Sequence, residues 1–416
     1  MINKLRQTIY TLLKRSEKFF QTDMIYLAKG GFWLTLGQIV SSLSSFLLAI
    51  AFANLLPKEV YGTYKYVLSI IGILSVFTLS GMGTSLTRSV ARGFEGSLIP
   101  ILKEKIKWGS IGSLVSLGIA VYYYLNANLT LTICFVIATI FLPLMDSLGI
   151  YGSLLNGRKN FKLSTKYNII IKVIATMLMI LVLIFNKNIF LILFTYFISY
   201  TSLRFIFLKI TIKKEKPNSE TELDTISYGK HLSLMNVILT IANNIDKIII
   251  FHYLGAIDLA IYTIAIAPIN QIKGVLSNIG IISFPKISQK NKYDLKKYLP
   301  IKIFKSIPII LFIVTVYIII APTLYKLFFP QYLGSVFYTQ IFSLSLLLFP
   351  KTLLGLGLLA NQKKKYLYYS RISYSLLKIL LLYILIQEFG ILGCILTLLI
   401  TNLINFITLF YFFKKI

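Results

Sequence analysis

The sequence predicts an all-α polytopic membrane protein with about twelve transmembrane helices in two six-helix bundles. Hydrophobic residues make up 56% of the 416 residues and charged residues only 14%, a balance that a soluble domain rarely has. Apolar runs of about twenty residues, the length that crosses a bilayer as a helix, follow one another along the chain. Stretches of the first half recur in the second half, which predicts pseudo-twofold symmetry between the bundles.

Short turn signals between predicted spans support these assignments, at Asn126 to Asn128, Asn186 to Asn188 and Phe389 to Gly390. The runs are too long and too continuous to be strands of a membrane barrel. The predicted spans are 31–54, 64–87, 108–125, 130–154, 167–185, 189–208, 229–252, 259–284, 303–321, 337–360, 366–387 and 390–413.

Outside the spans, two segments have a distinct composition. Residues 1–28 combine apolar and basic residues at helical spacing, which predicts an amphipathic cytoplasmic segment on the membrane surface; a partly ordered tail fits equally well. The polar stretch 211–228, which contains Pro217, is predicted to be a cytoplasmic linker. It separates an N-terminal six-helix bundle, 29–210, from a C-terminal one, 229–416.

The net charge of +29 lies mostly in alternate loops, which argues against a nucleic-acid partner. The opposite set of loops carries only Lys58, Lys65, Lys187 and Lys326. By the positive-inside rule, the basic loops and both termini are predicted to be cytoplasmic. Anionic lipid head groups are the expected secondary partners of these loops.

Polar residues form a stripe at helical spacing in the first span and again at corresponding positions of the seventh. The stripes comprise Thr35, Gln38, Ser42 and Ser45 in the first span and Ser233, Asn236, Thr240 and Asn243 in the seventh. Lipid disfavours a polar helix face, whereas a water-filled cavity accommodates one. The duplication predicts a shared cavity, and hydrogen bonding between helices is the alternative.

Basic residues extend these polar faces. Lys247 follows the seventh-span stripe by one helical step, and Asn270 with Lys273 forms a polar face in the eighth span. An ammonium in the membrane must be paired or hydrated, so both lysines are candidates to bind an anion, together with Arg88 at a cytoplasmic helix end. Alternatively, Lys247 pairs with Asp246 or reaches toward the membrane surface, and Arg88 only follows the topology rule.

Two acids lie inside predicted spans. Asp146 stands alone in the fourth span, and an isolated intramembrane carboxylate is a candidate for proton or sodium coupling; Asp246 is the second candidate. A structural ion pair or cap is equally compatible with Asp146. Lys172 and Lys378 occupy near-equivalent places in the fifth and eleventh spans, and we expect both to extend toward the cytoplasm.

Several motifs resemble those of a known group. They are the segment Leu56 to Tyr64, the segment Gly81 to Ser85 before Arg88, the turn Asn156 to Phe161, and Asn244 to Lys247 leading to Leu254, Gly255 and Tyr262. Together they resemble the oligosaccharide flippases of the multidrug/oligosaccharidyl-lipid/polysaccharide exporter (MOP) superfamily, whose lipid II flippases typically have two further C-terminal helices.

The resemblance implies a V-shaped, MATE-like pair of bundles in the bacterial cytoplasmic (inner) membrane. By alternating access, these would move a polyprenyl-diphosphate-linked oligosaccharide to the outer leaflet for polysaccharide biosynthesis, such as that of lipopolysaccharide O-antigen. Glycosyltransferases and a polysaccharide polymerase are the implied partners. The intramembrane acids make H+ or Na+ coupling one alternative, and facilitated flipping without an ion is the other. No metal or other cofactor is expected.

Two alternatives stay open. One is a cation-coupled multidrug exporter of the same superfamily, although such a pathway would favour buried acids over lysines. The other is an integral-membrane glycan-assembly enzyme, which would need acids, histidines or arginines near its substrate. His231 and His252 lie at opposite ends of one predicted span, and no pair of acids has metal-ligand spacing, so we expect no catalysis.

Overall fold

The computed structural model describes residues 24–288, 292–361 and 363–415, and this part of the chain contains helices but no strand. The predicted amphipathic segment 1–28 lies almost entirely outside the described residues. The α-helices are α2 (Met24–Leu55), α3 (Lys58–Leu74), α4 (Gly81–Ala91), α5 (Leu98–Leu125), α6 (Leu129–Met145), α7 (Tyr151–Gly157), α8 (Phe161–Phe185), α9 (Ile189–Glu215), α10 (Thr225–Leu254), α11 (Ala256–Ser288), α12 (Lys292–Phe328), α13 (Ser335–Ser343), α14 (Lys351–Ala360) and α15 (Lys364–Lys414).

Eleven helical stretches of the described chain are long and apolar enough to cross a membrane. The last of them, Lys365–Lys414, covers both the eleventh and the twelfth predicted span. Gly390 divides it, because its φ of 52° lies in the left-handed region that a helix interior does not use. The eleven stretches therefore correspond to the twelve predicted spans.

Three spans are interrupted by short 3₁₀ segments. The second span comprises α3, η1 (Ser75–Thr78) and α4, and the fourth comprises α6, η3 (Ser147–Ile150) and α7. The tenth is broken in the same way as the fourth, into α13, η5 (Leu344–Leu346) and α14. The fourth and tenth spans correspond in the internal repeat, so the two bundles share this irregularity.

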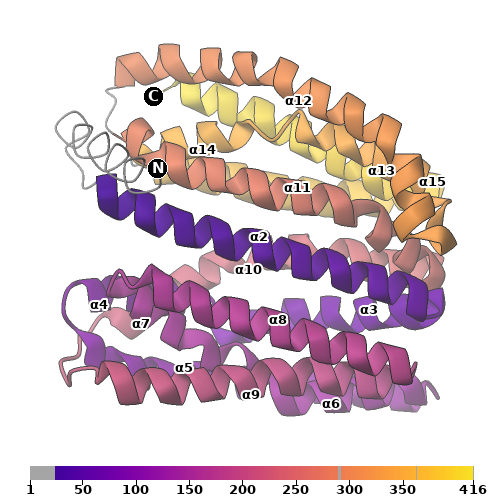
Figure 1. The fold of residues 1–416 in the computed structure, drawn as a ribbon, viewed down its shortest axis with the longest axis horizontal. Coiled ribbons are helices and arrows are strands. Elements are labelled where there is room, and N and C mark those ends of the chain that lie inside the picture. The colour runs from indigo at the N-terminus through magenta and orange to yellow at the C-terminus, as the bar shows by residue number, and fades with distance from the viewer. Residues whose placement is uncertain (1–23, 289–291, 362, 416) are drawn as a thin grey trace, which may run out of the picture.

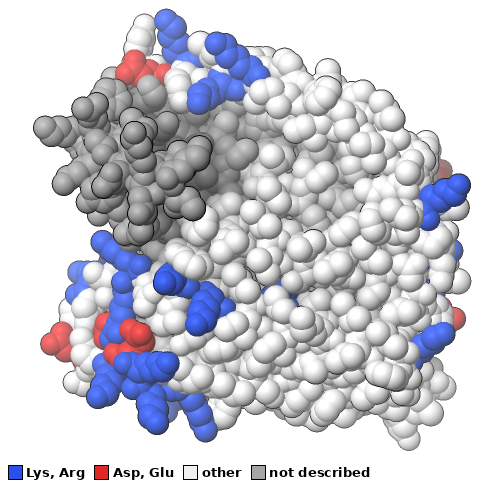
Figure 2. All heavy atoms as spheres, in the orientation of Figure 1, with Lys and Arg blue, Asp and Glu red and all other residues white. Residues whose placement is uncertain are grey.

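Figure 1 shows the helices running nearly parallel in two groups, with α3 to α9 on one side and α11 to α15 on the other. The start of α2, the end of α15, and helices α4 and α7 all lie at one end of the molecule. Lys and Arg side chains gather at this same end in Figure 2, whereas few appear at the opposite end. We call the basic end cytoplasmic, following the positive-inside prediction, and the opposite end outer.

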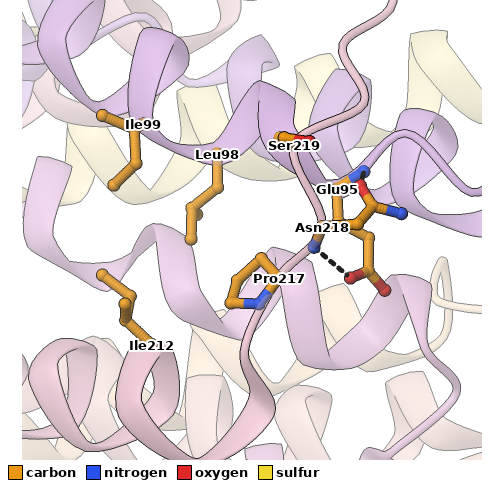
Figure 3. Close-up of a pocket in the computed structure, with 8 residues that line it drawn as sticks. Glu95, Leu98, Ile99, Ile212, Pro217, Asn218 and Ser219 are labelled. Atoms are coloured by element: carbon orange, nitrogen blue, oxygen red, sulfur yellow. Dashed lines mark hydrogen bonds between the residues drawn. The ribbon is translucent and has the colours of Figure 1, made fainter.

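At the cytoplasmic end, the polar linker between α9 and α10 is bound to the first bundle. Arg158 forms ion pairs with Glu95 at 2.5 Å and with Glu215 at 2.6 Å. The backbone N–H of Asn218 donates to Glu95 at 3.2 Å, and this contact borders a cavity of about 350 Å³ beside the linker (Figure 3). The Asn218 side chain also donates to the carbonyl of Gly93 at 2.7 Å.

At the outer end, the two bundles are in direct contact. A Cβ atom at Gly62 on α3 would lie 1.8 Å from the carbonyl oxygen of Ala256 on α11, so only glycine permits this approach. The amide of Asn54 donates to the carbonyl of Phe328 at 2.8 Å, and the Lys58 ammonium lies 5.2 Å from the ring centre of Tyr332. The pathway between the bundles is therefore closed at this end.

Candidate substrate-binding site

The polar stripe of α2 lies along a seam between the bundles, facing α11. Gln38 donates to Ser42 at 3.3 Å. A Cβ atom at Gly274 of α11 would lie 2.9 Å from the amide nitrogen of Gln38 and 3.6 Å from the hydroxyl oxygen of Ser42. Ser45, one turn further along α2, is partly buried. The absence of a side chain at Gly274 lets the polar face of α2 reach the second bundle.

The stripe of α10 lies along the related seam, facing the second span. The hydroxyl of Ser233 accepts from the N–H of Gly81 at 3.0 Å, and the amide of Asn236 donates to Ser80 at 3.3 Å. Thr240 donates to the backbone carbonyl of Asn236 at 3.0 Å. The cytoplasmic members of this stripe thus make the hydrogen bonds between helices that were the alternative to a cavity.

The outer members of the α10 stripe remain open. Asn243 is exposed, and the Lys247 ammonium is partly exposed and 3.4 Å from the carbonyl oxygen of Asn243. Asn270 on α11 is exposed as well, whereas its neighbour Lys273 lies 4.2 Å from the ring centre of Phe342. These side chains are available to a ligand, since no described contact occupies their polar groups fully.

Asp246 pairs with Lys378 rather than with Lys247. The Asp246 carboxylate accepts from the Tyr262 hydroxyl at 2.6 Å, and its other oxygen lies 3.8 Å from the Lys378 ammonium. Asp246 is only 4% exposed and Lys378 only 3%. The expectation that Lys378 extends toward the cytoplasm is wrong, because this carboxylate and the carbonyl of Ala242 provide buried partners.

Lys65 was counted with the outer loops, although it is the second residue of the predicted span 64–87. In the structure the second span begins at Lys58, directly after Pro57, and Lys65 lies well inside α3. Its ammonium is close enough to Lys247 and Lys172 for the positive charges to repel one another. Pro57 was the sequence signal for this earlier start, because proline is tolerated at the beginning of a helix.

Lys273 also has a cationic neighbour, Lys351 of the tenth span, and their charges repel. The Lys351 ammonium donates to the side-chain oxygen of Asn402 at 2.5 Å and lies 5.5 Å from the ring centre of Tyr374. Neither lysine forms an ion pair with a carboxylate in the described part of the chain. The second bundle thus carries uncompensated positive charge within the membrane.

Asp146 is not isolated. Its carboxylate lies 3.0 Å from the guanidinium of Arg204, which also donates to the backbone carbonyl of Met145. Arg204 lies near the end of the predicted sixth span, 189–208, and in the structure α9 continues beyond it as far as Glu215. The Asp146 side chain remains 39% exposed at the protein surface.

Arg88 lies in the last turn of α4, at the cytoplasmic end, with its guanidinium 4.8 Å from the ring centre of Tyr228 on α10. Both residues line a cavity of about 680 Å³, together with Arg92, Glu222 and His231. Over the described ranges, no cluster of His, Cys, Asp or Glu residues could hold a metal ion.

The sequence model of the family described as "Polysaccharide biosynthesis protein" matches residues 27–291, which is more than half of the chain. The chain belongs to this family. A curated relative, the uncharacterized membrane protein MJ1068 of Methanocaldococcus jannaschii, is 23% identical over 93% of this chain and 84% of its own length.

Solved structures show the same fold. The lipid II flippase MurJ in an inward closed conformation has a TM-score of 0.67 at 16% identity, over 91% of this chain and 87% of that one. A MATE transporter in complex with MaD5 has a TM-score of 0.65 at 14% identity, and the match covers 94% of this chain and 95% of the transporter. A third match is a MOP superfamily transporter from Pyrococcus furiosus, which is described as having a binding pocket of reversed polarity. Its TM-score is 0.53 at 14% identity, and the match covers 94% of this chain and 95% of that transporter. The predicted MATE-like fold of membrane-spanning helices is confirmed.

Proposed function

We propose that this protein is an alternating-access flippase that moves polyprenyl-diphosphate-linked oligosaccharide repeat units from the cytoplasmic to the outer leaflet. The proposal includes a place in the cytoplasmic membrane with both termini inside. In this role, glycosyltransferases supply the lipid-linked substrate and a polysaccharide polymerase consumes it. Membership of a polysaccharide biosynthesis family supports this assignment.

One observation carries the proposal: lysines inside the spans outnumber their carboxylate partners. Asp146 is paired with Arg204 and Asp246 with Lys378. Among the described ion pairs, no carboxylate is bound to five further lysines of the predicted spans, which are Lys65, Lys172, Lys247, Lys273 and Lys351. Ammonium groups held in a membrane without counter-ions favour an anionic ligand.

A lipid-linked diphosphate has the matching chemistry. Its polyprenyl tail can stay in the lipid, and only its phosphates and sugars need a polar path. Lysines bind phosphate as point charges, while Asn243 and Asn270, both exposed, offer hydrogen bonds to sugar hydroxyls. A drug cation would be repelled by the same lysines, which makes the multidrug exporter the second candidate.

For ion coupling, we propose Asp146 ahead of Asp246. A coupling carboxylate must exchange a proton or sodium ion with water, and the Asp146 side chain is 39% exposed. Asp246 is enclosed by its partners Tyr262 and Lys378. Its contacts instead support a structural role within the second bundle.

The decisive experiment measures leaflet reorientation of a fluorescent polyprenyl-diphosphate oligosaccharide in proteoliposomes that contain the purified protein. Lys247→Ala removes a charge-assisted contact worth about 1.5–3 kcal/mol, so we expect flipping to fall about tenfold or more. Lys247→Arg should retain part of the activity. Lys326→Ala, in the last turn of α12 at the outer end, is the matched control and should flip like the wild type.

The outcomes separate the candidate functions. Flipping that depends on Lys247 supports the proposal, and wild-type flipping by Lys247→Ala removes this residue from the site. Uptake of a lipophilic cation without flipping would establish a multidrug exporter. Neither activity would reopen the possibility of a glycan-assembly enzyme.

A further inference from the structure

Three consecutive residues at the start of α10, Tyr228, Gly229 and Lys230, all contact the first bundle. The ring centre of Tyr228 lies 4.8 Å from the guanidinium of Arg88 on α4. A Cβ atom at Gly229 would lie 3.2 Å from the Cα atom of Met82 on α4 and would force the Met82 sulfur to move, so the two helices approach closely here. Lys230 reaches the neighbouring helix α5. We call the contacts of these three residues the cytoplasmic clasp.

Lys230 makes the charged contact of the clasp. Its ammonium lies 2.5 Å from the carboxylate of Glu104 on α5 and 5.5 Å from the ring centre of Trp108, one helical turn further along α5. The indole N–H of Trp108 donates to the same carboxylate at 2.9 Å. Trp108 therefore holds the Glu104 carboxylate toward Lys230 and places its ring beside the ammonium.

This ion pair joins the two bundles. The other ion pairs among the described residues lie within the first bundle and its linker or within the second bundle, and Glu104 with Lys230 is the exception. Helix α10 is bound to α15 of the second bundle, because the Tyr368 hydroxyl donates to the Met235 sulfur at 2.9 Å and Asp246 has its buried partner on α15. If α10 moves with the second bundle, separation at the cytoplasmic end must break the pair of Glu104 and Lys230.

The start of α2, which corresponds to α10 in the internal repeat, has no such clasp among the described residues. Gly31 corresponds to Gly229, and Phe32 to Lys230. No described atom lies within 4 Å of the place that a Cβ atom at Gly31 would take, and the Phe32 side chain is exposed. The clasp is therefore not a consequence of the repeated fold, since one copy of the repeat forms it and the other does not.

The contacts of the clasp can be broken at little cost. The Lys230 side chain is 41% exposed and that of Glu104 is 18% exposed, so water can hydrate both charges when they separate. Ion pairs at such sites contribute little to stability. Separation of Asp246 and Lys378, in contrast, would leave two buried charges without partners. A contact that breaks and re-forms in every transport cycle needs the first kind of ion pair.

We propose that the cytoplasmic clasp is the inner gate of the transport pathway and that the pair of Glu104 and Lys230 is its latch. The latch is closed in this structure. It opens when the second bundle carries α10 away from α4 and α5, which admits the substrate from the cytoplasm. This inference rests on the proposed function, because it assigns one step of the alternating-access cycle to named residues.

Cross-linking tests whether the latch must open during transport. Glu104→Cys/Lys230→Cys is treated with a short bifunctional methanethiosulfonate, which joins the two introduced thiols and is released by dithiothreitol; the native Cys134 and Cys394 are buried. We expect flipping of the fluorescent polyprenyl-diphosphate oligosaccharide to fall about tenfold or more on cross-linking and to return after reduction, because a gate that cannot open stops turnover. Unchanged flipping by the cross-linked protein would overturn the inference, since the clasp would then stay closed throughout the cycle.

A matched control pair lies on α5 itself. Lys103 and Lys107 are both exposed, are one helical turn apart and flank Glu104 in the sequence. A cross-link between the thiols of Lys103→Cys/Lys107→Cys stays within one helix and does not join the bundles. Flipping by this variant should therefore be the same before and after treatment.

A second measurement needs no substrate and covers the case in which the cross-linking variant does not fold. The Ser85 hydroxyl on α4 donates to the backbone carbonyl of Thr225 on α10, and Ser85 is buried, so Ser85→Cys places a thiol inside the closed seam. In inside-out vesicles, an impermeant maleimide should label this variant slowly. Adding Glu104→Gln should speed the labelling by up to about fivefold, the most that an exposed ion pair contributes.

Exchange of the two charges separates the ion pair from a change in side-chain size. Glu104→Lys brings two ammonium groups together and should speed labelling at Ser85→Cys beyond the rate with Glu104→Gln. Glu104→Lys/Lys230→Glu restores opposite charges and should return most of the way to the slow rate. Equal labelling rates in all these variants would also overturn the inference. Absence of flipping by the wild type, with labelling that follows the charges as expected, would instead refute the proposed function.

Discussion

The buried pair of Asp246 and Lys378 allows a quantitative prediction. Replacing Lys378 with Met removes the cation 3.8 Å from the Asp246 carboxylate and leaves the Tyr262 hydroxyl as the carboxylate's remaining described side-chain partner. Breaking a buried ion pair by removing one partner costs about 3–5 kcal/mol, because an unpaired charge stays buried. We expect the free energy of unfolding of Lys378→Met to fall by this amount.

The double variant Asp246→Leu/Lys378→Met removes both charges. We expect it to recover most of the lost stability, because replacing a buried ion pair with apolar residues is often neutral or stabilising. Helix content followed by circular dichroism in mixed detergent, as the denaturing detergent fraction rises, measures the four states of this double-mutant cycle. The coupling energy between the two changes should be about 3 kcal/mol or more.

An exposed pair provides the control. Arg92 and Glu222 pair at the cytoplasmic end, where the Arg92 side chain is 52% exposed. Ion pairs at such sites contribute about 0–1 kcal/mol, so Arg92→Met/Glu222→Gln should show a coupling energy within that range. Purely additive losses at Asp246 and Lys378 would refute the reasoning and show that their charges are not paired in the folded protein.

Three further predictions concern coupling, topology and the outer seam. Asp146→Asn should flatten the dependence of transport on pH or sodium, and an unchanged dependence would leave Asp146 with a structural role only. Cysteines at Lys187 and Lys326 should react with an impermeant maleimide added outside intact cells; labelling only after lysis would reverse the assigned topology. Gly62→Val should prevent closure at Ala256, so that flipping falls at least tenfold while the protein still inserts; normal flipping would show that this contact can open without loss.

Much of the fold could be predicted from the sequence, because hydrocarbon imposes a simple rule on the chain. Apolar runs must be helical and about as long as the bilayer is thick, and loops carry the charge. The limits of single elements were harder to place. The segment from Lys58 to Thr63 was predicted to be an outer loop because it is polar. In the structure it forms the first turns of α3, which begins directly after Pro57. Gly390 divides the last two spans by a kink at non-helical backbone angles.

The site was harder to predict than the fold, because its interactions join helices that are distant in sequence. The polar stripes of α2 and α10 were identified correctly as polar faces, but their cytoplasmic members contact the facing bundle rather than open water. The pairing of Asp246 with Lys378, and of Asp146 with Arg204, depends on helix packing that no local pattern encodes. Lys65 was counted with the outer loops because the predicted second span began at residue 64, whereas α3 begins at Lys58.

The arrangement of charges suggests how substrate and conformation are linked. Both intramembrane acids pair within their own bundle, Asp146 with Arg204 in the first and Asp246 with Lys378 in the second, so neither pair must break when the bundles separate. Lys65, in contrast, belongs to the first bundle and repels Lys247 of the second. Opposed cations favour separation of the bundles, and a bound diphosphate between them would remove that repulsion. In the proposed cycle, the anion that is transported is therefore also the group that permits the two bundles to close around it.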